Sequence, residues 1–523
     1  MKKITQYVLH PFFVAMYPIL FLLSVNAGQI PLQQAGRVLA LSLLVALFLT
    51  LLLGVITKDF RRGGFLATIL LALFFSYGHV YNWFESNVLF LASHIFLDVM
   101  WVAFLLWGIW AAYKIRNIGN VNKYLNIIML FLLVQPVFSL GLFIYTSGIP
   151  QEIKPPSPFD NIQVDSQDAK NLPDIYYIIL DAHGRSDVVQ EVFGYDNSPF
   201  IKHLKERGFY VADQSRSNYI QTMLSISSSM NFDYLNFKGM SPESTDRDPL
   251  SGLISNSALR QFLEKQGYQT VTFSTGYNTT TITNSDIVIP YKANKLFNDF
   301  EEMLLTTSLT SSLSEKTQAQ LFVDPFKCDA RRGYTLNIFE NLKKIPELPG
   351  PKFIFAHILS PHPPFIFDAE GNPVDHGGCR VNDGDYFTGT REDYLIGYPQ
   401  QLAYTDKMIQ DVIDTILEKS KNPPVIVIQG DHGSGMLLDW ESAKKTCKRE
   451  RTAILNAYYI PGLKNDQLYE TITPVNSFRV VLNEVFDLQL PLLEDRTYYS
   501  GWYTPYELVD VTDKIEDVCK FRK

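Results

Sequence analysis

Apolar residues dominate the first 148 positions of the chain and then give way to a mixed pattern. Five apolar segments in this part are each long enough to span about 30 Å of hydrocarbon. They run from Val8 to Ala27, Val38 to Ile56, Phe65 to Trp83, Val88 to Ala112 and Leu125 to Tyr145. A secretory signal peptide is shorter and would not precede four further spans. The pattern predicts an N-terminal all-α transmembrane bundle of five helices over residues 1–148.

Basic residues lie mainly on one side of these spans. They precede the first span and occupy the loops after the second and fourth, at Lys2, Lys3, Lys58, Arg61, Arg62, Lys114, Arg116 and Lys123. The loop after the first span has only Arg37, and the loop after the third has no basic residue. Cytoplasmic loops carry the excess of Lys and Arg. We therefore expect a multi-pass protein of the cell (inner) membrane, with a cytoplasmic N-terminus and, after an odd number of spans, a periplasmic or extracellular C-terminal domain.

Two ionisable residues interrupt the fourth predicted span. His94 and Asp98 are four positions apart and therefore share one face of a helix. Ionisable groups inside a membrane are costly and often functional. We favour the simpler interpretation, in which they hydrogen-bond neighbouring helices or lie near the outer headgroups.

From residue 172 onward, short continuous apolar runs alternate with amphipathic stretches, after a proline-containing linker at 149–171. Buried strands are predicted at Ile175–Leu180, Thr270–Phe273, Phe353–Ile358 and Val425–Gln429. Helical patterns between them include Ser198–Arg207, Gln401–Glu418 and Asn476–Phe486. Buried strands separated by helices indicate an α/β domain over 172–523, with a mostly parallel sheet covered by helices on both faces.

Charge and cysteine content narrow the function classes. The net charge is −8 and no basic stripe is present, so nucleic-acid binding is not expected. All four cysteines lie in the second part of the chain, at Cys328, Cys379, Cys447 and Cys519. Their spacing does not suit a zinc site. In a domain outside the cytoplasm they permit one or two disulfides, and unpaired buried thiols are equally compatible with the sequence.

Three predicted strands end in acidic or imidazole residues. Asp181 follows the first, His357 and His362 lie at and beyond the end of another, and Asp431 and His432 follow the last. The carboxyl ends of parallel strands meet at one sheet edge, where ligand sites gather. Carboxylates and imidazoles together suit zinc or manganese. A single Asp after a strand is more often a helix N-cap, whereas Asp-His followed by a turn-permitting glycine is a stronger signal.

Thr222 lies in a serine-rich segment, 217–229, at a position where a helix could begin. Its hydroxyl would then face backbone N–H groups and the positive end of the helix dipole. A hydroxyl that also touched a metal would be activated as a nucleophile. From the local sequence alone, a plain capping threonine is the better interpretation.

The order of these motifs resembles the alkaline phosphatase and sulfatase superfamily. The motifs are the Asp after a strand at 181, Thr-x-x-Ser at 222–225, His-x-x-Ser-Pro-His-x-Pro at 357–364 and Gly-Asp-His-Gly at 430–433. The similarity, over about residues 172–490, is to its membrane-anchored branch, which includes lipoteichoic acid synthases and lipid A phosphoethanolamine transferases. Those enzymes also carry five membrane helices before an exported catalytic domain.

The resemblance assigns roles to individual residues. It implies four metal ligands, Asp181, Thr222, Asp431 and His432, with Thr222 also the nucleophile. It implies that His362, and less directly His357, are catalytic and contact the phosphate or the leaving group, and that His362, Ser225 and Asn218 bind substrate. The transferases usually have Glu where this chain has Asp181, the residue of the phosphatase branch. No histidine follows His432 to build a second site, so one divalent metal, Zn²⁺ or Mn²⁺, is expected.

The resemblance implies a membrane-anchored enzyme that transfers a substituted phosphoryl group of the phosphoglycerol or phosphoethanolamine type. The donor would be a membrane phospholipid, the acceptor an envelope glycan or lipid, and the intermediate a phosphothreonine. Sulfatases proper need a cysteine in a Cys-x-Pro-x-Arg setting, which this chain lacks. Two alternatives stay open: a sulfatase-like phosphoesterase that uses water as acceptor, and a catalytically inactive envelope binding protein.

Overall fold

The computed structural model describes residues 7–27, 30, 32–88, 93–147, 172–237, 240–293, 297–310, 312, 327–376, 378–379, 381–463, 467–515 and 519. The predicted linker at 149–171 lies outside these residues. Contacts divide the chain into two compact units. The helical unit comprises Met1–Gln151 and Lys295–Phe326, and the α/β unit comprises Glu152–Asn294 and Lys327–Lys523. Residues 295–326, which fall within the range expected for the C-terminal domain, thus belong to the helical unit.

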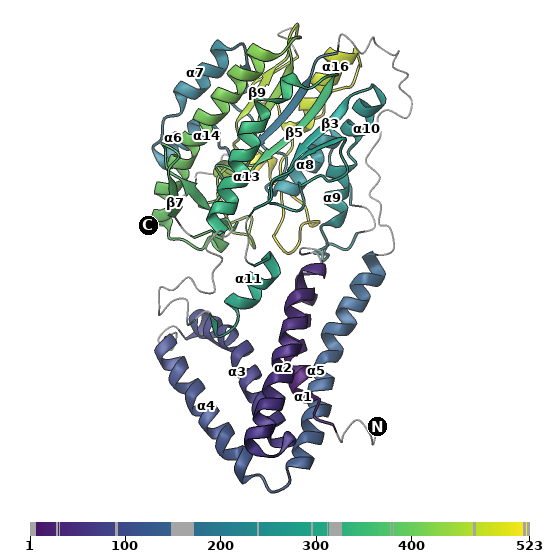
Figure 1. The fold of residues 1–523 in the computed structure, drawn as a ribbon. Coiled ribbons are helices and arrows are strands. Elements are labelled where there is room, and N and C mark those ends of the chain that lie inside the picture. Colours follow the sequence, from purple (N-terminus) through teal and green to yellow (C-terminus); the bar gives the residue numbers. More distant parts are fainter. Residues whose placement is uncertain are drawn as a thin grey trace. The chain divides into compact units, whose positions relative to one another are not determined.

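The helical unit contains the five expected apolar helices (Figure 1). They are α1 (His10–Val25), α2 (Gly36–Thr57), α3 (Phe60–Asn87), α4 (His94–Lys114) and α5 (Ile118–Ser147). Helices α2 to α5 are long and apolar enough to cross a membrane. Helix α1 has 16 residues, which is about 24 Å at 1.5 Å per residue. It begins at His10 and ends at Val25, so it is shorter than the predicted span from Val8 to Ala27.

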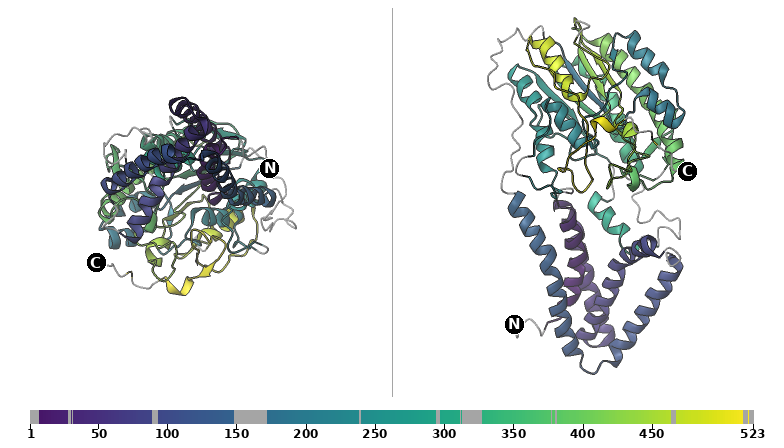
Figure 2. Two further views of the ribbon diagram at one scale, coloured as in Figure 1. Left: turned by 90° about the horizontal axis from the view of Figure 1, so that it is seen from below. Right: turned by 180° about the vertical axis from the view of Figure 1, so that it is seen from behind.

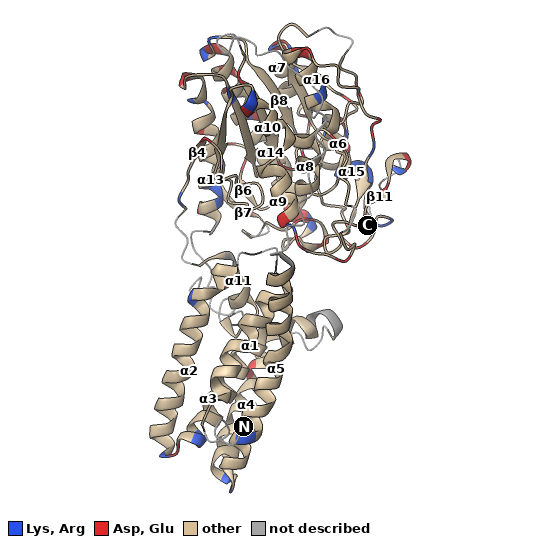
Figure 3. Ribbon diagram, turned by 90° about the vertical axis from the view of Figure 1, so that its right-hand side faces the viewer, with Lys and Arg blue, Asp and Glu red and all other residues tan. Residues whose placement is uncertain are grey.

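Basic residues gather mainly at one end of these helices, while most of their length carries no charge (Figure 3). The turns between α2 and α3 and between α4 and α5 lie at that end (Figure 1). Asp59 caps α3 by accepting a hydrogen bond from Arg61 N at 2.9 Å. Arg62 donates to the carbonyl oxygens of Ala112 and Ile115 at the end of α4, where the helix dipole favours a cation.

The polar residues of α4 bind their neighbours. Tyr77, on α3, donates a hydrogen bond to Asp98 Oδ1 at 2.8 Å, and its hydroxyl lies 2.9 Å from His94 Nδ1. Ser312 also donates to Asp98, at 3.2 Å. In the same unit α11 (Asp299–Thr306) carries Glu301, which pairs with Arg37. His94 and Asp98 thus hydrogen-bond a neighbouring helix, as expected.

A seven-stranded sheet forms the centre of the α/β unit, in the order β2-β9-β8-β1-β5-β3-β4. The strands are β2 (Tyr210–Val211), β9 (Asn456–Tyr459), β8 (Val425–Gln429), β1 (Ile175–Leu180), β5 (Lys352–Ile358), β3 (Gln269–Phe273) and β4 (Ile287–Ile289). The five strands from β8 to β4 are parallel, whereas β9 runs antiparallel to both β8 and β2. This confirms the mostly parallel sheet.

Helices cover both faces of the sheet, seen from opposite sides in Figures 1 and 2. They are α6 (Ser186–Phe193), α7 (Ser198–Glu206), α8 (Thr222–Asn231), α9 (Asp248–Ser255), α10 (Ala258–Lys265), α13 (Lys327–Leu342), α14 (Arg391–Lys419), α15 (Lys448–Thr452) and α16 (Pro474–Phe486). All six residues of β1 are buried. Tyr177 and Ile179 pack in one core with α8, α10 and α16, while Tyr176 and Ile178 pack in the other with α7, α13 and α14. The continuous apolar run in β1 therefore reflects burial on both faces.

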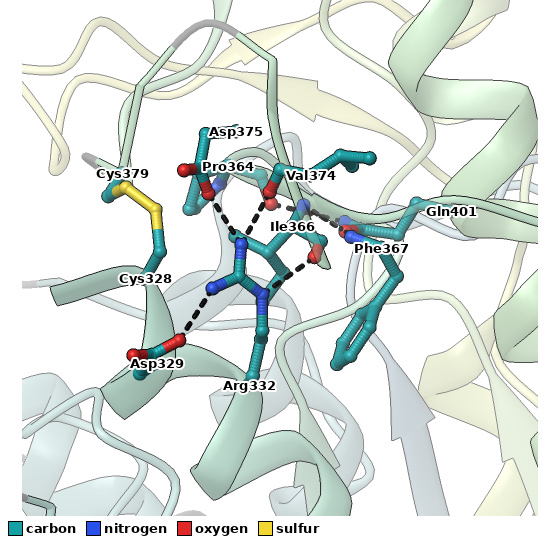
Figure 4. Close-up of a disulfide and its surroundings, with 10 residues drawn as sticks. All are labelled: Cys328, Asp329, Arg332, Pro364, Ile366, Phe367, Val374, Asp375, Cys379 and Gln401. Atoms are coloured by element: carbon teal, nitrogen blue, oxygen red, sulfur yellow. Dashed lines mark hydrogen bonds and ion pairs between the residues drawn. A yellow bond between two sulfur atoms is a disulfide. The ribbon is translucent and has the colours of Figure 1, made fainter. Parts of the chain in front are cut away.

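Two disulfides, Cys328–Cys379 and Cys447–Cys519, use all four cysteines, with Cα–Cα separations of 5.2 Å in both. The first holds α13 beside the hairpin of β6 (Phe365–Phe367) and β7 (Pro373–His376) (Figure 4). Arg332, one turn along α13, donates to Ile366 O and Val374 O at 2.9 and 2.6 Å. The alternative of unpaired thiols is wrong.

We expect replacement of Cys328 and Cys379 by serine to lower the free energy of unfolding by roughly 2–4 kcal/mol, because the unfolded chain regains the freedom of a 51-residue separation. Thermal unfolding of the purified full chain, compared with the wild type, measures the loss. Peptide mapping without reductant should recover both cystine pairs. Four alkylated cysteines in the untreated protein would contradict the pairing.

Candidate metal centre

Strands β1, β5 and β8 carry the candidate ligands to the same edge of the sheet. In the strand register Ile179 is opposite His357 on one side and Gln429 on the other. Asp181 follows β1, and its backbone N–H donates to Ile358 O at 2.9 Å. The loop after β5 turns back, and His362 N donates to Asp181 O at 3.0 Å. Backbone hydrogen bonds thus place residues that are far apart in sequence next to one another.

Asp181 is shared by two overlapping groups of possible metal ligands. One group comprises Asp181, His362 and His432, and the other comprises Asp181, His357 and Asp431. Within each group the ligand atoms lie within 4.8 Å of one another, and all five side chains are buried. The structure therefore brings together five of the residues that the sequence analysis proposed for the site, all at or beyond strand ends.

Backbone carbonyls orient two of the imidazoles. His362 Nδ1 lies 2.5 Å from Pro363 O, and His432 Nδ1 lies 2.9 Å from Gly433 O. A carbonyl oxygen only accepts, so Nδ1 carries the proton in the neutral rings and Nε2 keeps its lone pair. This is the arrangement by which outer hydrogen bonds orient histidine ligands in metal sites.

The Nε2 atoms of the site face carboxylates. His357 Nε2 lies 3.2 Å from Asp181 Oδ2, with its Nδ1 2.8 Å from Thr280 Oγ1. His432 Nε2 lies 3.3 Å from Asp431 Oδ2 and 3.5 Å from Asp181 Oδ1. The donor atoms therefore converge on one small volume.

Within the described part of the chain, three of these buried atoms have no hydrogen-bond partner: Asp181 Oδ1, Asp431 Oδ2 and His357 Nε2. A buried polar atom without a partner costs roughly 1–3 kcal/mol. Carboxylate oxygens and imidazole nitrogens are the ligands of a divalent cation such as zinc or manganese. The residues present therefore fit a divalent metal ion.

Local charge sets the ionisation of the centre. Burial acts to raise the pKa of Asp181, but the imidazoles of His362, His357 and His432 hold that pKa below its ordinary value. Burial lowers the pKa of His432, and the positive charge of Arg451 lowers it further. At neutral pH the site therefore offers an ionised carboxylate beside a neutral imidazole, the forms that bind metal.

Thr222 is the first residue of α8, and its Oγ1 lies 3.1 Å from His432 Nε2. The N-cap of the helix is Gln221, and no side chain caps it. Gln221 Nε2 donates to Ser500 Oγ and Gly501 O at 2.8 and 2.9 Å, which fixes the start of the helix. Thr222 is half-buried. The interpretation of Thr222 as a plain capping residue is wrong, because its hydroxyl contacts the metal centre.

The two predicted substrate-binding residues lie in different surroundings. Ser225 is buried one turn along α8, where its N–H donates to Gln221 O at 3.0 Å. The side chain of Asn218 is fully engaged: its amide donates to Thr473 Oγ1 at 2.9 Å and its carbonyl oxygen accepts from Val475 N at 2.8 Å. Asn218 therefore links the segment before α8 to the start of α16. A part in substrate binding stays a prediction for both residues.

Sequence reasoning missed two charged residues beside the site. Asp383 accepts hydrogen bonds from Arg451 Nη1 at 2.6 Å and from Tyr394 at 2.9 Å, and lies 3.8 Å from His362 Nε2. Arg451 also donates to Gly433 O at 3.2 Å. Burial raises the pKa of Asp383, but Arg451 and the nearby histidines bring it below its ordinary value. Neither residue belongs to a motif or follows a predicted strand, so no local signal identified them.

Comparisons with known proteins identify the family of the chain. Residues 173–478 match the model of the sulfatase family, and a comparison with curated proteins gave no match. Among solved structures, the C-terminal periplasmic domain of EcEptC from Escherichia coli has a TM-score of 0.45 and 12% identity, over 68% of this chain and 96% of that one.

Two further structures are similar at the same level. Lipooligosaccharide phosphoethanolamine transferase A from Neisseria meningitidis, an integral membrane protein, has a TM-score of 0.36 and 12% identity over 91% of this chain and 95% of that one. The phosphonate monoester hydrolase of Agrobacterium radiobacter has a TM-score of 0.38 and 11% identity over 62% and 80%. Likenesses of this extent leave the substrate open. The family match, however, spans more than half of the chain and includes the strand-end carboxylates and imidazoles: the chain belongs to the sulfatase family and is an enzyme of phosphate or sulfate ester chemistry.

Proposed function

We propose that this enzyme transfers a substituted phosphoryl group, of the phosphoglycerol or phosphoethanolamine type, from a membrane phospholipid to an envelope glycan or lipid. The observation that carries the proposal is the position of Thr222. Its hydroxyl lies 3.1 Å from His432 Nε2, at the start of a ten-residue helix. The N-terminal end of α8 favours an anionic phosphoryl group on that hydroxyl.

Four residues would hold one divalent metal, Zn²⁺ or Mn²⁺: Asp181, Thr222, Asp431 and His432. When bound, such an ion would neutralise negative charge on the phosphoryl oxygens and lower the pKa of a nearby hydroxyl. No histidine follows His432 to build a second site, which supports a single ion rather than two. His357 and His362 complete the wall of the site on the β5 side.

The reaction has two displacements at phosphorus. In the first, Thr222 Oγ1 loses its proton and bonds to phosphorus, and the bond to the lipid alcohol breaks, which leaves a phosphothreonine. The neutral His362 ring takes up the Thr222 proton at Nε2, and the resulting imidazolium binds a phosphoryl oxygen and then protonates the departing alcohol. In the second, an acceptor hydroxyl attacks phosphorus and gives its proton to His362 Nε2, and the threonine oxygen leaves and takes that proton back. Water in place of the acceptor would give hydrolysis by the same residues.

The chain's membrane helices and disulfides support a lipid donor outside the cytoplasm. Four helices are long and apolar enough to cross a membrane, so that they hold the enzyme where phospholipid is concentrated. The cystines Cys328–Cys379 and Cys447–Cys519 are typical of an oxidising compartment. With the basic loops facing the cytoplasm, we place the protein in the inner membrane and the α/β unit outside it.

We expect the purified full chain to contain about one divalent metal ion per molecule and the variants Asp431→Asn and His432→Ala to lose it. Removal of one ligand weakens binding well beyond the roughly 10–100-fold effect of an outer-shell change. Elemental analysis after dialysis measures the content. His203→Ala is the matched control, because this histidine pairs with Asp414 on the helices away from the site. Equal metal content in all variants would contradict the assigned ligands.

Thr222→Ala should abolish turnover, a loss on the order of 10⁴-fold or more for a nucleophile, with thermal unfolding unchanged. Thr222→Ser should keep part of the activity. Phospholipid labelled in the phosphoryl group reports both steps, through label trapped on the protein and through products formed with and without acceptor glycan. His203→Ala, which lies away from the site, serves as the control. Full activity of Thr222→Ala would disprove the mechanism, whereas label on Ser225 would correct only the nucleophile.

A further inference from the structure

Arg247 is a buried guanidinium that no carboxylate neutralises among the described residues. It immediately precedes α9 and is 2% exposed. Nη1 donates to Thr245 O at 3.2 Å and Nη2 donates to Trp502 O. Nε, also buried, has no hydrogen-bond partner in the described ranges. A guanidinium has five N–H donors and stays charged in proteins, so much of the binding capacity of Arg247 is unused.

This environment differs from that of three other buried arginines in the α/β unit, whereas Arg479, like Arg247, donates to backbone carbonyls. Arg451 pairs with Asp383, Arg260 with Glu264, and Arg332 with Asp329 and Asp375. Buried charges are normally paired because an uncompensated charge is costly to remove from water. Burial lowers the pKa of Arg247, which reflects this cost. An anion from outside the chain would offset it.

Aromatic contacts connect Arg247 to the metal centre. Its guanidinium carbon lies 4.4 Å from the ring centre of Trp502, whose ring lies 5.3 Å from that of Trp440. The guanidinium of Arg451 lies 5.4 Å from the Trp440 ring and donates to Gly433 O, next to His432. The segment of Trp502 is also tied to the start of α8, because Gln221 donates to Gly501 O at 2.9 Å.

A second route runs through Tyr277. Its ring centre lies 6.4 Å from that of His357. Tyr277 also packs against the buried cluster that contains Leu250, three residues after Arg247, and Met223, next to Thr222. The segment that begins with Arg247 therefore packs against the helix that carries Thr222, through a ring that also lies next to His357.

Solvent reaches the residues next to Arg247. Trp502 is only half-buried, and Tyr503 is 56% exposed. The Trp502 ring lies over the guanidinium, 4.4 Å from its central carbon. An anionic group that enters from solvent would reach Arg247 past these two partly exposed side chains.

We propose that Arg247, held against Trp502, binds a phosphate oxyanion of the substrate beside the metal centre. The planar guanidinium can donate two parallel hydrogen bonds to such a group. The inference deepens the proposed function, since it names the charge of the substrate group that the site receives. The anion belongs either to the phosphodiester of the donor or to a phosphate on the acceptor.

Equilibrium binding of inorganic phosphate to the metal-free full chain in neutral detergent tests the site without catalysis. Phosphorus NMR titration should give a saturable site, which Arg247→Gln weakens about tenfold or more, the usual scale of a charge-assisted bidentate contact. Arg247→Lys should weaken it less, because the charge remains and the fork is lost. If the glutamine variant does not fold, the phosphate affinity of the lysine variant still tests the proposal.

Arg479→Gln is the matched control. Arg479 is 5% exposed and, like Arg247, donates to two backbone carbonyls, those of Phe232 and Pro491. Loss of stability alone would appear in both variants, whereas weaker phosphate binding should appear only at Arg247. An absence of phosphate binding in the wild-type chain, or equal affinity in the wild type, Arg247→Gln and Arg247→Lys, would overturn the proposal.

Single-turnover measurements separate the two sources of the anion. If Arg247 binds the donor, the Gln variant should slow diacylglycerol release in the absence of acceptor. If Arg247 binds the acceptor, release should be unchanged and only transfer to a phosphorylated acceptor should slow. Unchanged rates in both steps would contradict a role in either. The phosphate titration is independent of Thr222, so failure of the phosphotransfer mechanism would leave the test of this anion site intact.

Discussion

Burial of two carboxylates at neighbouring strand ends is the constraint on which the site depends. An ionised carboxylate is strongly disfavoured away from water unless charges or hydrogen bonds compensate it. Asp181 is 2% exposed, as is Asp431, and each leaves one oxygen without a hydrogen-bond partner. The surrounding imidazoles present Nε2 toward these oxygens because other atoms hold Nδ1. A divalent ion completes this compensation, so the loops after β1, β5 and β8 are built around a cation.

The backbone just after β1 has an unusual conformation, which helps to orient Asp181 toward the site. Ala182 has φ of 63°, in the left-handed region that is unfavourable for a residue with a Cβ and is often maintained at functional sites. Its N–H donates to Asp431 Oδ1 at 3.1 Å. Tyr398 donates to Ala182 O at 2.8 Å and accepts from Gly184 N at 3.0 Å. The buried helix α14 thus stabilises the turn that aims Asp181 at the centre.

Features encoded by local pattern were predictable, and those created by distant contacts were not. The run Ile175–Leu180 predicts a strand buried on both faces, and the residues just beyond strand ends predict the ligands. Asp383 and Arg451 form an ion pair although they are 68 positions apart. No periodicity or motif in the sequence predicts this pair. The assignment of Lys295–Phe326 to the helical unit likewise depends on long-range contacts, such as the ion pair of Glu301 with Arg37. The sequence around each of these two residues gives no sign of the other.

Charge balance narrows the substrate. The two carboxylates Asp181 and Asp431 would be neutralised by one divalent ion, and Asp383 neutralises Arg451. Arg247 then contributes a positive charge that no carboxylate pairs with among the described residues. A phosphodiester carries one negative charge and matches it, whereas the dianion of a phosphate monoester leaves an excess. Sulfate esters have the same single charge as diesters, but the chain lacks the Cys-x-Pro-x-Arg setting that sulfatases need and instead has Thr222 at the centre. Within the proposed function, this charge balance suits the transfer of a phosphodiester group.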